Sequence, residues 1–320
     1  MSAALAVAAC LEPPHASHPL HAPDRVWPET NCYVDLWIEL LHARGLEPAA
    51  MLGFTLRQDF EGDQFTFSKP YAADLDRLYG LEILELAVYD GLEAQARVQV
   101  ARGLPVLVEV DAIHLPDTAA TTYRREHAKT TVAILGLDPE RRSLDYLHNA
   151  GRFTLRGADY DGLFGPTTLF PYAEFVKATG FALPPDALAG AALELLRAHR
   201  GRAPRSNPVL AFRAALERTG DGLVRQPLGV FHRYAFNTTR QLGANFELLG
   251  SHLAWLDAAG LADFGPAAQA AAGLAREVKA FQFQLARAFG RRDAAPLPAG
   301  LDRPAATYEA VFSALDRALR

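Results

Sequence analysis

Length, composition and charge limit the classes of protein that this chain can be. It has 320 residues, of which 50% are hydrophobic, so it can bury a large core. With Lys+Arg 32 against Asp+Glu 37 and no basic run, it lacks the positive surface that nucleic-acid binding requires. No apolar run approaches the roughly 18 residues that span a bilayer, and the first ten residues lack the basic start of a signal peptide. We expect a globular cytoplasmic protein that binds neither nucleic acid nor membrane.

The beginning of the chain is rich in proline and shows no helical or strand period. We expect residues 1–23 to form an extended segment on the surface. Its histidines His15, His18 and His21 suggest a metal tract, but without accompanying cysteines or a cluster of acids a solvated tail is the better interpretation. Cys10 and Cys32 are the only cysteines, so the chain has no disulfide framework and Cys32 is expected to be a free thiol.

Residues 24–184 alternate between helical and strand patterns. Apolar residues from 33 to 45 have helical spacing, and the short alternating runs on either side of residues 61–63 predict a hairpin or a loop with strand-like arms. The β-branched run at 105–113 is typical of a buried central strand. The remaining predicted elements are helices at 72–79 and 91–103 and strands at 81–89, 127–137 and 142–155, the last two forming an antiparallel pair. These elements predict an α+β domain with a mainly antiparallel sheet.

Residues 185–320 have a different character, because alanine and leucine recur there with helical spacing between glycines and prolines. We expect an all-helical C-terminal domain of about five helices. One of them, at about 231–255, carries a row of polar side chains on one face. Two arginines in one row can bind a phosphate or carboxylate, although a solvent-exposed face has the same pattern. The candidate substrate-binding residues of this row are Arg233, Asn237, Arg240 and Glu247.

Cys32 stands where the proline-rich approach meets the first predicted helix. The unpaired N–H groups and the dipole of a helix N-terminus stabilise an anion, so they favour a thiolate at this position. A thiolate is the form of cysteine that acts as a nucleophile, and the same N–H groups can receive the oxyanion formed by attack on a carbonyl. A lone cysteine is also commonly a small buried hydrophobic residue, and this alternative stays open.

A histidine and an asparagine in the predicted hairpin supply the other groups that such chemistry requires. His127 begins one strand and Asn149 lies toward the end of the next. A turn at residues 139–141 makes the numbers of paired residues sum to about 280, which places Asn149 opposite Thr131 and diagonally toward His127. Asp145 would lie too far along the ladder. We expect Asn149 to orient the imidazole of His127, which takes the thiol proton and later returns it to a leaving group.

Several longer stretches of the sequence resemble those of a known family. PETNCYVDLWIELL, PVLVEVDAIHLPDTA and YRREHAKTTVAILGLD, followed by LHNAG, resemble a bacterial family of uncharacterised proteins with a papain-like fold. The likeness covers most of residues 24–290. That family is similar in turn to the N-terminal domain of the butirosin-biosynthesis acyltransferase, a weaker likeness that is confined to the α+β part.

The resemblance implies a papain-like α+β fold and an acyl-transfer reaction. Enzymes of this kind transfer an acyl or aminoacyl group from the phosphopantetheine thioester of a carrier protein to a small amine, through an acyl group on cysteine. The roles implied here are Cys32 as nucleophile, His127 as base and acid and Asn149 as the orienting residue. No glutamine shortly before Cys32 matches the oxyanion donor of papain, so Asn31 or main-chain amides take that role. The partners implied are an acyl or aminoacyl carrier protein and an amine, and the protein itself needs no cofactor, since the carrier protein holds the phosphopantetheine.

Other polar residues have two interpretations each. Asp111, at the end of the central strand, could accept a substrate amine or be an ordinary strand-end carboxylate. The acidic residues of 59–64 could bind an ammonium group, but a solvated turn has the same composition. His114, Asp117, His127 and His148 could form a metal set, although their spacing matches no standard zinc pattern.

Two alternative functions remain beside the acyltransferase. A thiol amidase or peptidase would use the same groups and pass the acyl group to water. A non-catalytic binding protein would use the helical domain to recruit a partner and the α+β domain as a scaffold.

Overall fold

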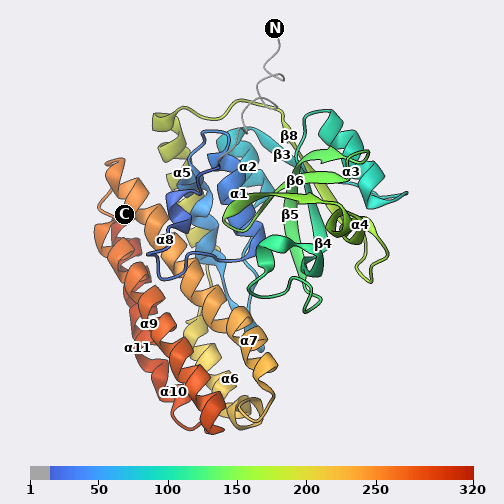
Figure 1. Ribbon diagram of the computed structural model, residues 1–320. Helices are drawn as coiled ribbons and strands as arrows, with labels where there is room; N and C mark the ends of the chain where they lie inside the picture. The colour runs from blue at the N-terminus through green and yellow to red at the C-terminus, as the bar shows by residue number, and fades with distance from the viewer. Residues whose placement is uncertain (1–14) are drawn as a thin grey trace. The chain divides into compact units, whose positions relative to one another are not determined.

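The computed structural model describes residues 15–320, so Cys10 and most of the predicted N-terminal segment lie outside the described residues (Figure 1). The chain divides into two compact units. The first contains the described residues up to Pro19 together with Asn31–Pro48 and Ala72–Ala182. The second contains Leu20–Thr30, Ala49–Tyr71 and Leu183–Arg320, so two segments that precede residue 185 pack with the helical part.

The first unit is built on one antiparallel sheet, which confirms the predicted α+β class. Its strands lie in the order β3-β8-β4-β5-β6-β7, and every neighbouring pair is antiparallel. The strands are β3 (Leu81–Glu85), β4 (Val106–Asp111), β5 (Lys129–Asp138), β6 (Ser143–His148), β7 (Gly151–Arg156) and β8 (Ala173–Ala178). The run at 105–113 does form a strand inside the sheet, β4, as its continuous apolar sequence predicts.

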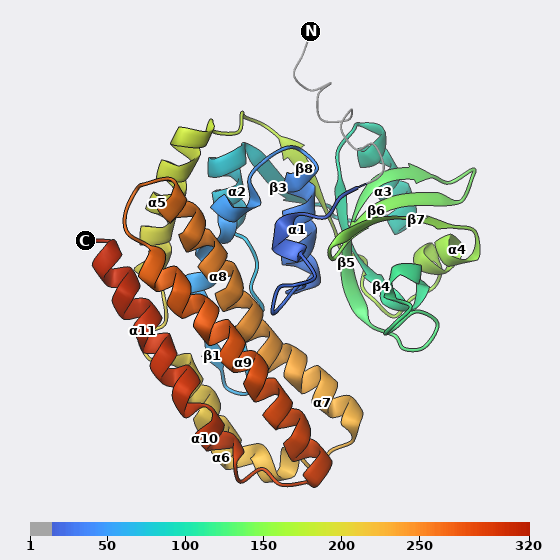
Figure 2. The ribbon, with the colours of Figure 1, turned by 60° about the vertical axis from the view of Figure 1, so that its left-hand side comes forward.

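The two faces of this sheet are covered by different helices (Figure 2). Val106, Val108 and Val110 of β4 point to one face and join a buried cluster with residues of α3 (Leu92–Ala101) and α4 (Ala158–Phe164). Helix α1 (Cys32–His42) packs on β5 and β6 from the other face. The unit also contains α2 (Ala72–Tyr79) beside β3, and its short 3-10 turns are Ala112–His114 and Pro116–Thr118.

One expected strand is in fact two. The sequence pattern at 142–155 predicts a single strand, whereas the structure forms β6 and β7 with a turn at Asn149 and Ala150. Asn149 has φ 46, in the left-handed region that asparagine tolerates better than most residues. His148 pairs with Gly151, so the turn has two residues, a length that needs such a backbone conformation. The asparagine that was expected to lie within a strand therefore makes the turn.

The second unit is helical, as predicted for the C-terminal part. Its helices are α5 (Pro185–Arg200), α6 (Pro208–Leu223), α7 (Leu228–Ala235), α8 (Gln241–Ala258), α9 (Gly265–Arg291), α10 (Leu297–Gly300) and α11 (Asp302–Ala318). The helix expected at 231–255 is α7 and α8 joined by a π-helical turn, Phe236–Arg240. A two-stranded hairpin of β1 (Phe60–Glu61) and β2 (Gln64–Phe65) confirms the one predicted there. The 3-10 segments are Pro19–His21 and Pro48–Arg57.

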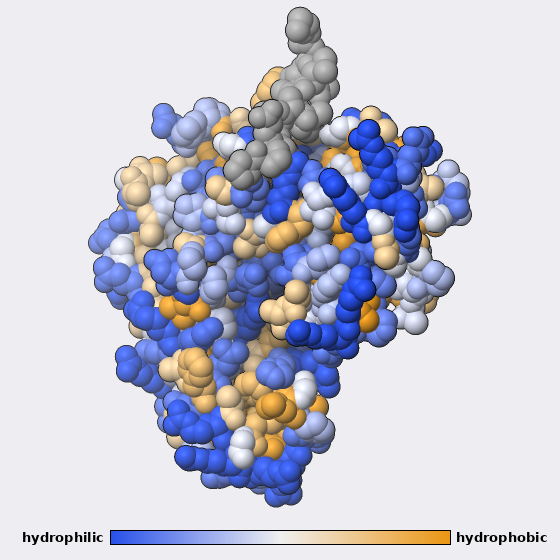
Figure 3. Space-filling view, in the orientation of Figure 1, coloured by the Kyte–Doolittle hydropathy of each residue, from blue (hydrophilic) through white to orange (hydrophobic). Residues whose placement is uncertain are grey.

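The surface of the helical unit mixes charged and apolar residues. Figure 3 shows apolar residues gathered among charged ones over the lower helices of this unit. Leu228 and Phe283 are among its exposed large apolar side chains. Within residues 15–320, no helix combines the length and the apolar character that crossing a membrane requires.

Candidate functional site

Cys32 is the first residue of α1, and its position follows from the cap that precedes it. The side-chain oxygen of Asn31 accepts the backbone N–H groups of Tyr33 and Val34 at 3.2 and 3.0 Å. Asn31 is extended and buried, so it is a well-formed N-cap. The Cys32 thiol is free and half-buried. The carbonyl oxygen of the Asn31 amide is used by the cap, and an oxyanion would need a donor instead, such as a main-chain amide.

Helix α1 lies on the sheet face that carries Asp111. The Tyr33 hydroxyl donates to Glu174 of β8 at 2.8 Å. Glu174 is paired with Leu107 of β4, and directly paired residues point to the same face. Because side chains alternate along a strand, Leu107 and Asp111 also share a face. The thiol-bearing helix and the carboxylate at the end of β4 are therefore on the same side of the sheet.

His127 and Asp111 form a pair at the edge of this face. The distance between His127 Nδ1 and Asp111 Oδ2 is 2.6 Å. Burial opposes ionisation of Asp111, but the hydrogen bonds from His127 and from the N–H groups of Ile113 and Ala128 outweigh it, so its pKa lies below the ordinary value. A carboxylate on Nδ1 directs Nε2 outward as the basic nitrogen. The His127 side chain is 81% exposed.

The structure gives His127 a partner, Asp111, that the sequence analysis did not assign to it, while Asn149 lies in the turn after β6. Ala133 pairs with Leu147 and Ile134 with Tyr146, a sum of 280, and beyond a register shift at Ile134–Gly136 the paired numbers sum to 281, both close to the expected value. Extending that register places Asn149 at the level of Thr131, four residues from His127, which is roughly 13 Å along a strand. The carboxylate that the structure places beside the His127 ring is that of Asp111, on the neighbouring strand, and the role of Asn149 stays a prediction.

A second imidazole pair is buried, and sequence reasoning missed it. His148 Nδ1 lies 2.5 Å from Asp117 Oδ2, and His148 Nε2 lies 2.8 Å from the Thr130 hydroxyl. The Tyr146 hydroxyl donates to the other oxygen of Asp117. The side chains of His148 and Asp117 are only 2% and 4% exposed. This arrangement attaches the loop containing Asp117 to the hairpin, and no sequence spacing reveals it because the loop has no regular period.

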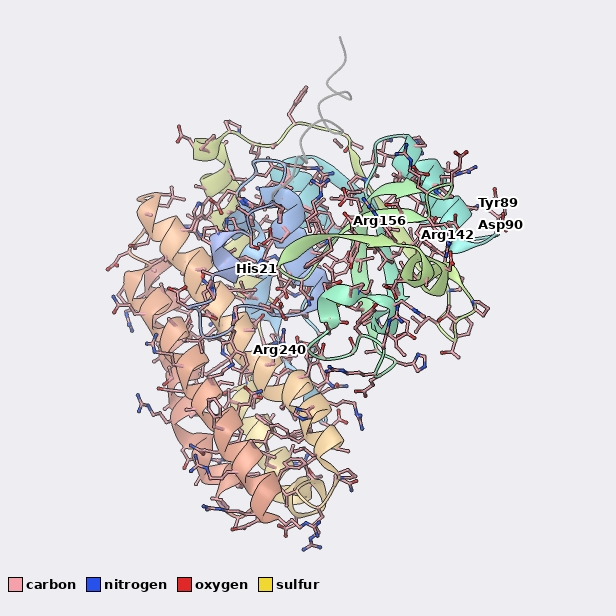
Figure 4. The ribbon with its side chains drawn as sticks, in the orientation of Figure 1. His21, Tyr89, Asp90, Arg142, Arg156 and Arg240 are labelled. Atoms are coloured by element: carbon pink, nitrogen blue, oxygen red, sulfur yellow. The ribbon has the colours of Figure 1, made fainter. Side chains whose placement is uncertain are left out.

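The polar row of the second unit contacts its own chain. Glu247 of α8 accepts the backbone N–H groups of Val26 and Trp27 at 3.0 and 2.7 Å. Arg240, which is labelled in Figure 4, donates a guanidinium N–H to the carbonyl of Thr30 at 2.9 Å. These contacts explain why a helix face with glutamate and arginine is not simply solvated. Two members of the row, Glu247 and Arg240, therefore contact residues 25–30, the segment that runs up to Asn31 in the sequence.

Trp27 anchors this segment among the helices of the second unit. It is buried, its indole N–H donates to the carbonyl of Ala275 at 3.1 Å, and the ammonium of Lys279 lies 3.9 Å above its ring. Gly243 of α8 faces the ring so closely that a Cβ there would lie 2.4 Å from it. Of the other predicted members of the row, Asn237 donates its side-chain N–H to the carbonyl of Arg233, one turn earlier in the same helix.

The other expected sites are placed as follows. Among residues 15–320, no group of three or more His, Cys, Asp or Glu side chains is arranged to hold a metal ion. His114 lies against Gly162 of α4. His15 lies 2.5 Å from the buried carboxylate of Glu39 in α1, so this histidine packs on the first unit. In the acidic stretch at 59–64, Asp59 accepts the N–H of Phe60 through its side chain and Glu61 is exposed.

Comparison with known families gives two matches, which together cover most of the described chain. Residues 16–178 match the DUF1839 N-terminal domain, and residues 185–317 match the DUF1839 C-terminal domain. The chain therefore belongs to the DUF1839 family. A search of curated proteins gave no match.

Proposed function

We propose that this protein is a papain-like, cysteine-dependent acyl or aminoacyl transferase in which Cys32 carries the acyl group. The observation that supports the proposal best is the shared sheet face: α1 begins with Cys32 and packs on the face where Asp111 holds His127. A thiol at a helix N-terminus and an imidazole oriented by a carboxylate are the two groups that nucleophilic catalysis by cysteine requires. The orienting residue in this proposal is Asp111 rather than Asn149.

The proposed reaction has two steps. His127 Nε2 takes the Cys32 proton, and the thiolate attacks the carbonyl carbon of a carrier-protein thioester. The new carbon–sulfur bond forms as the bond to the phosphopantetheine sulfur breaks, and that sulfur receives the proton from His127. An amine then attacks the acyl-cysteine, loses a proton to His127, and displaces Cys32, which regains the proton as the amide is released. The cofactor belongs to the carrier protein throughout.

Mass spectrometry of the intact protein tests the proposal. We expect a panel of acyl-loaded and aminoacyl-loaded carrier proteins to leave one acyl group on the protein, and expect Cys32→Ala to abolish it. Cys10→Ala is the matched control, because it removes the only other cysteine and should leave the adduct unchanged. If no donor gives an adduct while iodoacetamide alkylates Cys32, the transferase proposal fails.

Incubation with the loaded carrier proteins also separates the three candidate functions, through the products that form. A thiol amidase would release free acid at the same rate with or without an added amine, whereas a transferase consumes the amine and forms an amide. A binding protein would form a complex with a partner without any covalent change at Cys32. The contacts of Glu247 and Arg240 with residues 25–30 give the helical unit a structural role that is compatible with each of these functions.

A further inference from the structure

The loop that connects β4 to β5 is bounded by Asp111 and His127, the paired side chains of the proposed site. Its base is closed by the N–H of Ala112, which donates to the carbonyl of Ala128 at 2.8 Å, and by the N–H of Ala128, which donates to the Asp111 carboxylate at 3.1 Å. The ladder of β4 and β5 ends where Asp111 pairs with Lys129, so His127 lies beyond it. The ladder therefore fixes Asp111, whereas the position of His127 also depends on the loop before it.

Two consecutive hydrogen-bonded turns connect the middle of this loop to His127. The carbonyl of Thr118 accepts the N–H of Thr122 at 3.0 Å. The carbonyl of Thr122 in turn accepts the N–H of Glu126, the residue before His127, at 3.1 Å. Such turns fix the path of the backbone between their ends, so a displacement of Thr118 would be passed on to His127.

A buried imidazole links the chain before His127 to the chain after it. Asp117, which precedes Thr118, has its Oδ2 atom 2.5 Å from Nδ1 of His148. The other ring nitrogen of His148, Nε2, lies 2.8 Å from the hydroxyl of Thr130. Thr130 belongs to β5 and comes three residues after His127. The His148 ring therefore holds together two points of the chain that flank His127.

This network lies on the opposite face of the sheet from the Asp111 carboxylate. Thr130 pairs with Val110, so both side chains point to the face that α3 and α4 cover. Asp111 is the next residue of β4, so its side chain points to the other face. Because His148 is buried on the far side, it acts on His127 through the backbone rather than by contact with its ring.

We propose that Asp117 and His148 are positioning residues for His127: they hold the loop so that the imidazole stays on Asp111 with its proton on Nδ1. The His127 side chain is 81% exposed, so its own surroundings restrain it little, and the hydrogen bond to Asp111 decides which nitrogen carries the proton. Nε2 is then the basic nitrogen. The inference rests on the proposed acyltransferase function for its role in catalysis, which is to keep Nε2 ready to take the Cys32 proton.

Nitrogen NMR of the full chain with isotope-labelled histidine tests the inference, because the ring signals show which nitrogen carries the proton. In the parent protein we expect the neutral imidazole of His127 to carry it on Nδ1, and His127→Gln assigns the signals. Asp117→Asn should move about half of the molecules or more to the form with the proton on Nε2. Thr130→Val removes only the hydroxyl at His148 Nε2 and should change the proton position in the same direction. Single-turnover acylation of Cys32 should slow about tenfold in both variants, as is usual for loss of a supporting contact.

Arg124→Gln is the matched control, because Arg124 lies in the same loop but its exposed side chain joins the loop to Asp159 of α4. It should leave the proton of His127 on Nδ1. The inference is overturned by an unchanged proton position in Asp117→Asn and Thr130→Val, or by an equal change in Arg124→Gln, in proteins with unchanged circular dichroism. If Asp117→Asn does not fold, the milder Thr130→Val decides the question.

The NMR signals separate a failure of this inference from a failure of the proposed function. They need no acyl donor, so they report on His127 even if no carrier protein acylates Cys32. An unchanged proton position together with normal acylation of Cys32 would reject the positioning role and leave the acyltransferase proposal standing.

Discussion

Asp111 and His127 meet at the junction of two neighbouring strands, with 2.6 Å between Asp111 Oδ2 and His127 Nδ1. Asp111 is the last residue of β4, and His127 comes two residues before β5, which pairs with β4. The carboxylate also accepts the N–H groups of Ile113 and Ala128. Three donors on one carboxylate hold it ionised and fixed, which is what an orienting residue requires.

The first prediction distinguishes Asp111 from Asn149 as the orienting residue. Asp111→Asn should slow acylation of Cys32 by a thioester about 100-fold or more, since an amide cannot stabilise an imidazolium or select the same tautomer. Asn149→Gly should change the rate little, because a turn residue with positive φ is replaced by the residue best suited to it. Single-turnover acylation followed by intact mass measures both rates. A larger loss with Asn149→Gly would restore the original assignment.

The second prediction concerns the packing of Trp27 on α8. Gly243→Ala would place a Cβ 2.4 Å from the indole, so the ring or the helix must move. We expect the free energy of unfolding to fall by about 1–3 kcal/mol, the usual cost of overpacking. Gly190→Ala in the middle of α5 is the control, because no atom lies within 4 Å of its Cβ position. That substitution should stabilise the protein by about 0.5–1 kcal/mol in urea unfolding. Equal effects of the two would mean that Trp27 does not occupy this site.

The third prediction is an acid sensitivity that arises from His252. Burial lowers its pKa to about 4, the hydrogen bond to the Ala49 carbonyl opposes this shift, and His199 adds to it. Its folded pKa lies below the ordinary 6.5, so the unfolded chain binds the proton more readily. Its contribution to stability is therefore present above pH 6.5 and lost as the pH falls toward 4, by about 3 kcal/mol.

Thermal or urea unfolding at several pH values between 7 and 4 measures how steeply the stability falls with pH. His252→Gln removes the titrating group, so the variant should lose less stability over this range than the parent protein, even if it is less stable at pH 7. An unchanged slope would show that His252 is already protonated in the folded protein or that it is accessible to water.

The fourth prediction concerns the buried pair of His148 and Asp117. Asp117→Asn removes the carboxylate that contacts both the His148 imidazole, which is 2% exposed, and the Tyr146 hydroxyl, and leaving a buried polar group unsatisfied costs about 1–3 kcal/mol. Asp159→Asn is a milder comparison, since its partner Arg124 is exposed. Urea unfolding should show a several-fold larger loss of unfolding free energy for Asp117→Asn than for Asp159→Asn. Similar losses for the two variants would mean that water reaches His148.

The sequence by itself determined the local elements and the chemistry of single residues. The helical period after Asn31, the apolar run of β4 and the Ala/Leu-rich helices predict their own structures, because hydrophobic spacing sets which side of an element is buried. The position of Cys32 at a helix N-terminus and the register of β5 with β6 also follow from local pattern. The turn at Asn149 was missed because Asn-Ala-Gly inside an apolar run is a weaker turn signal than Asn-Gly.

Tertiary structure decided which polar residues meet. His127 was expected to face Asn149 across the following hairpin, yet it pairs with Asp111, because β4 also borders β5 and its last residue lies nearer. Glu247 and Arg240 bind residues 25–30, more than 200 positions away in the sequence. Contacts of this length depend on how helices pack, and the spacing of residues along one helix contains no information about the segment that will cover it.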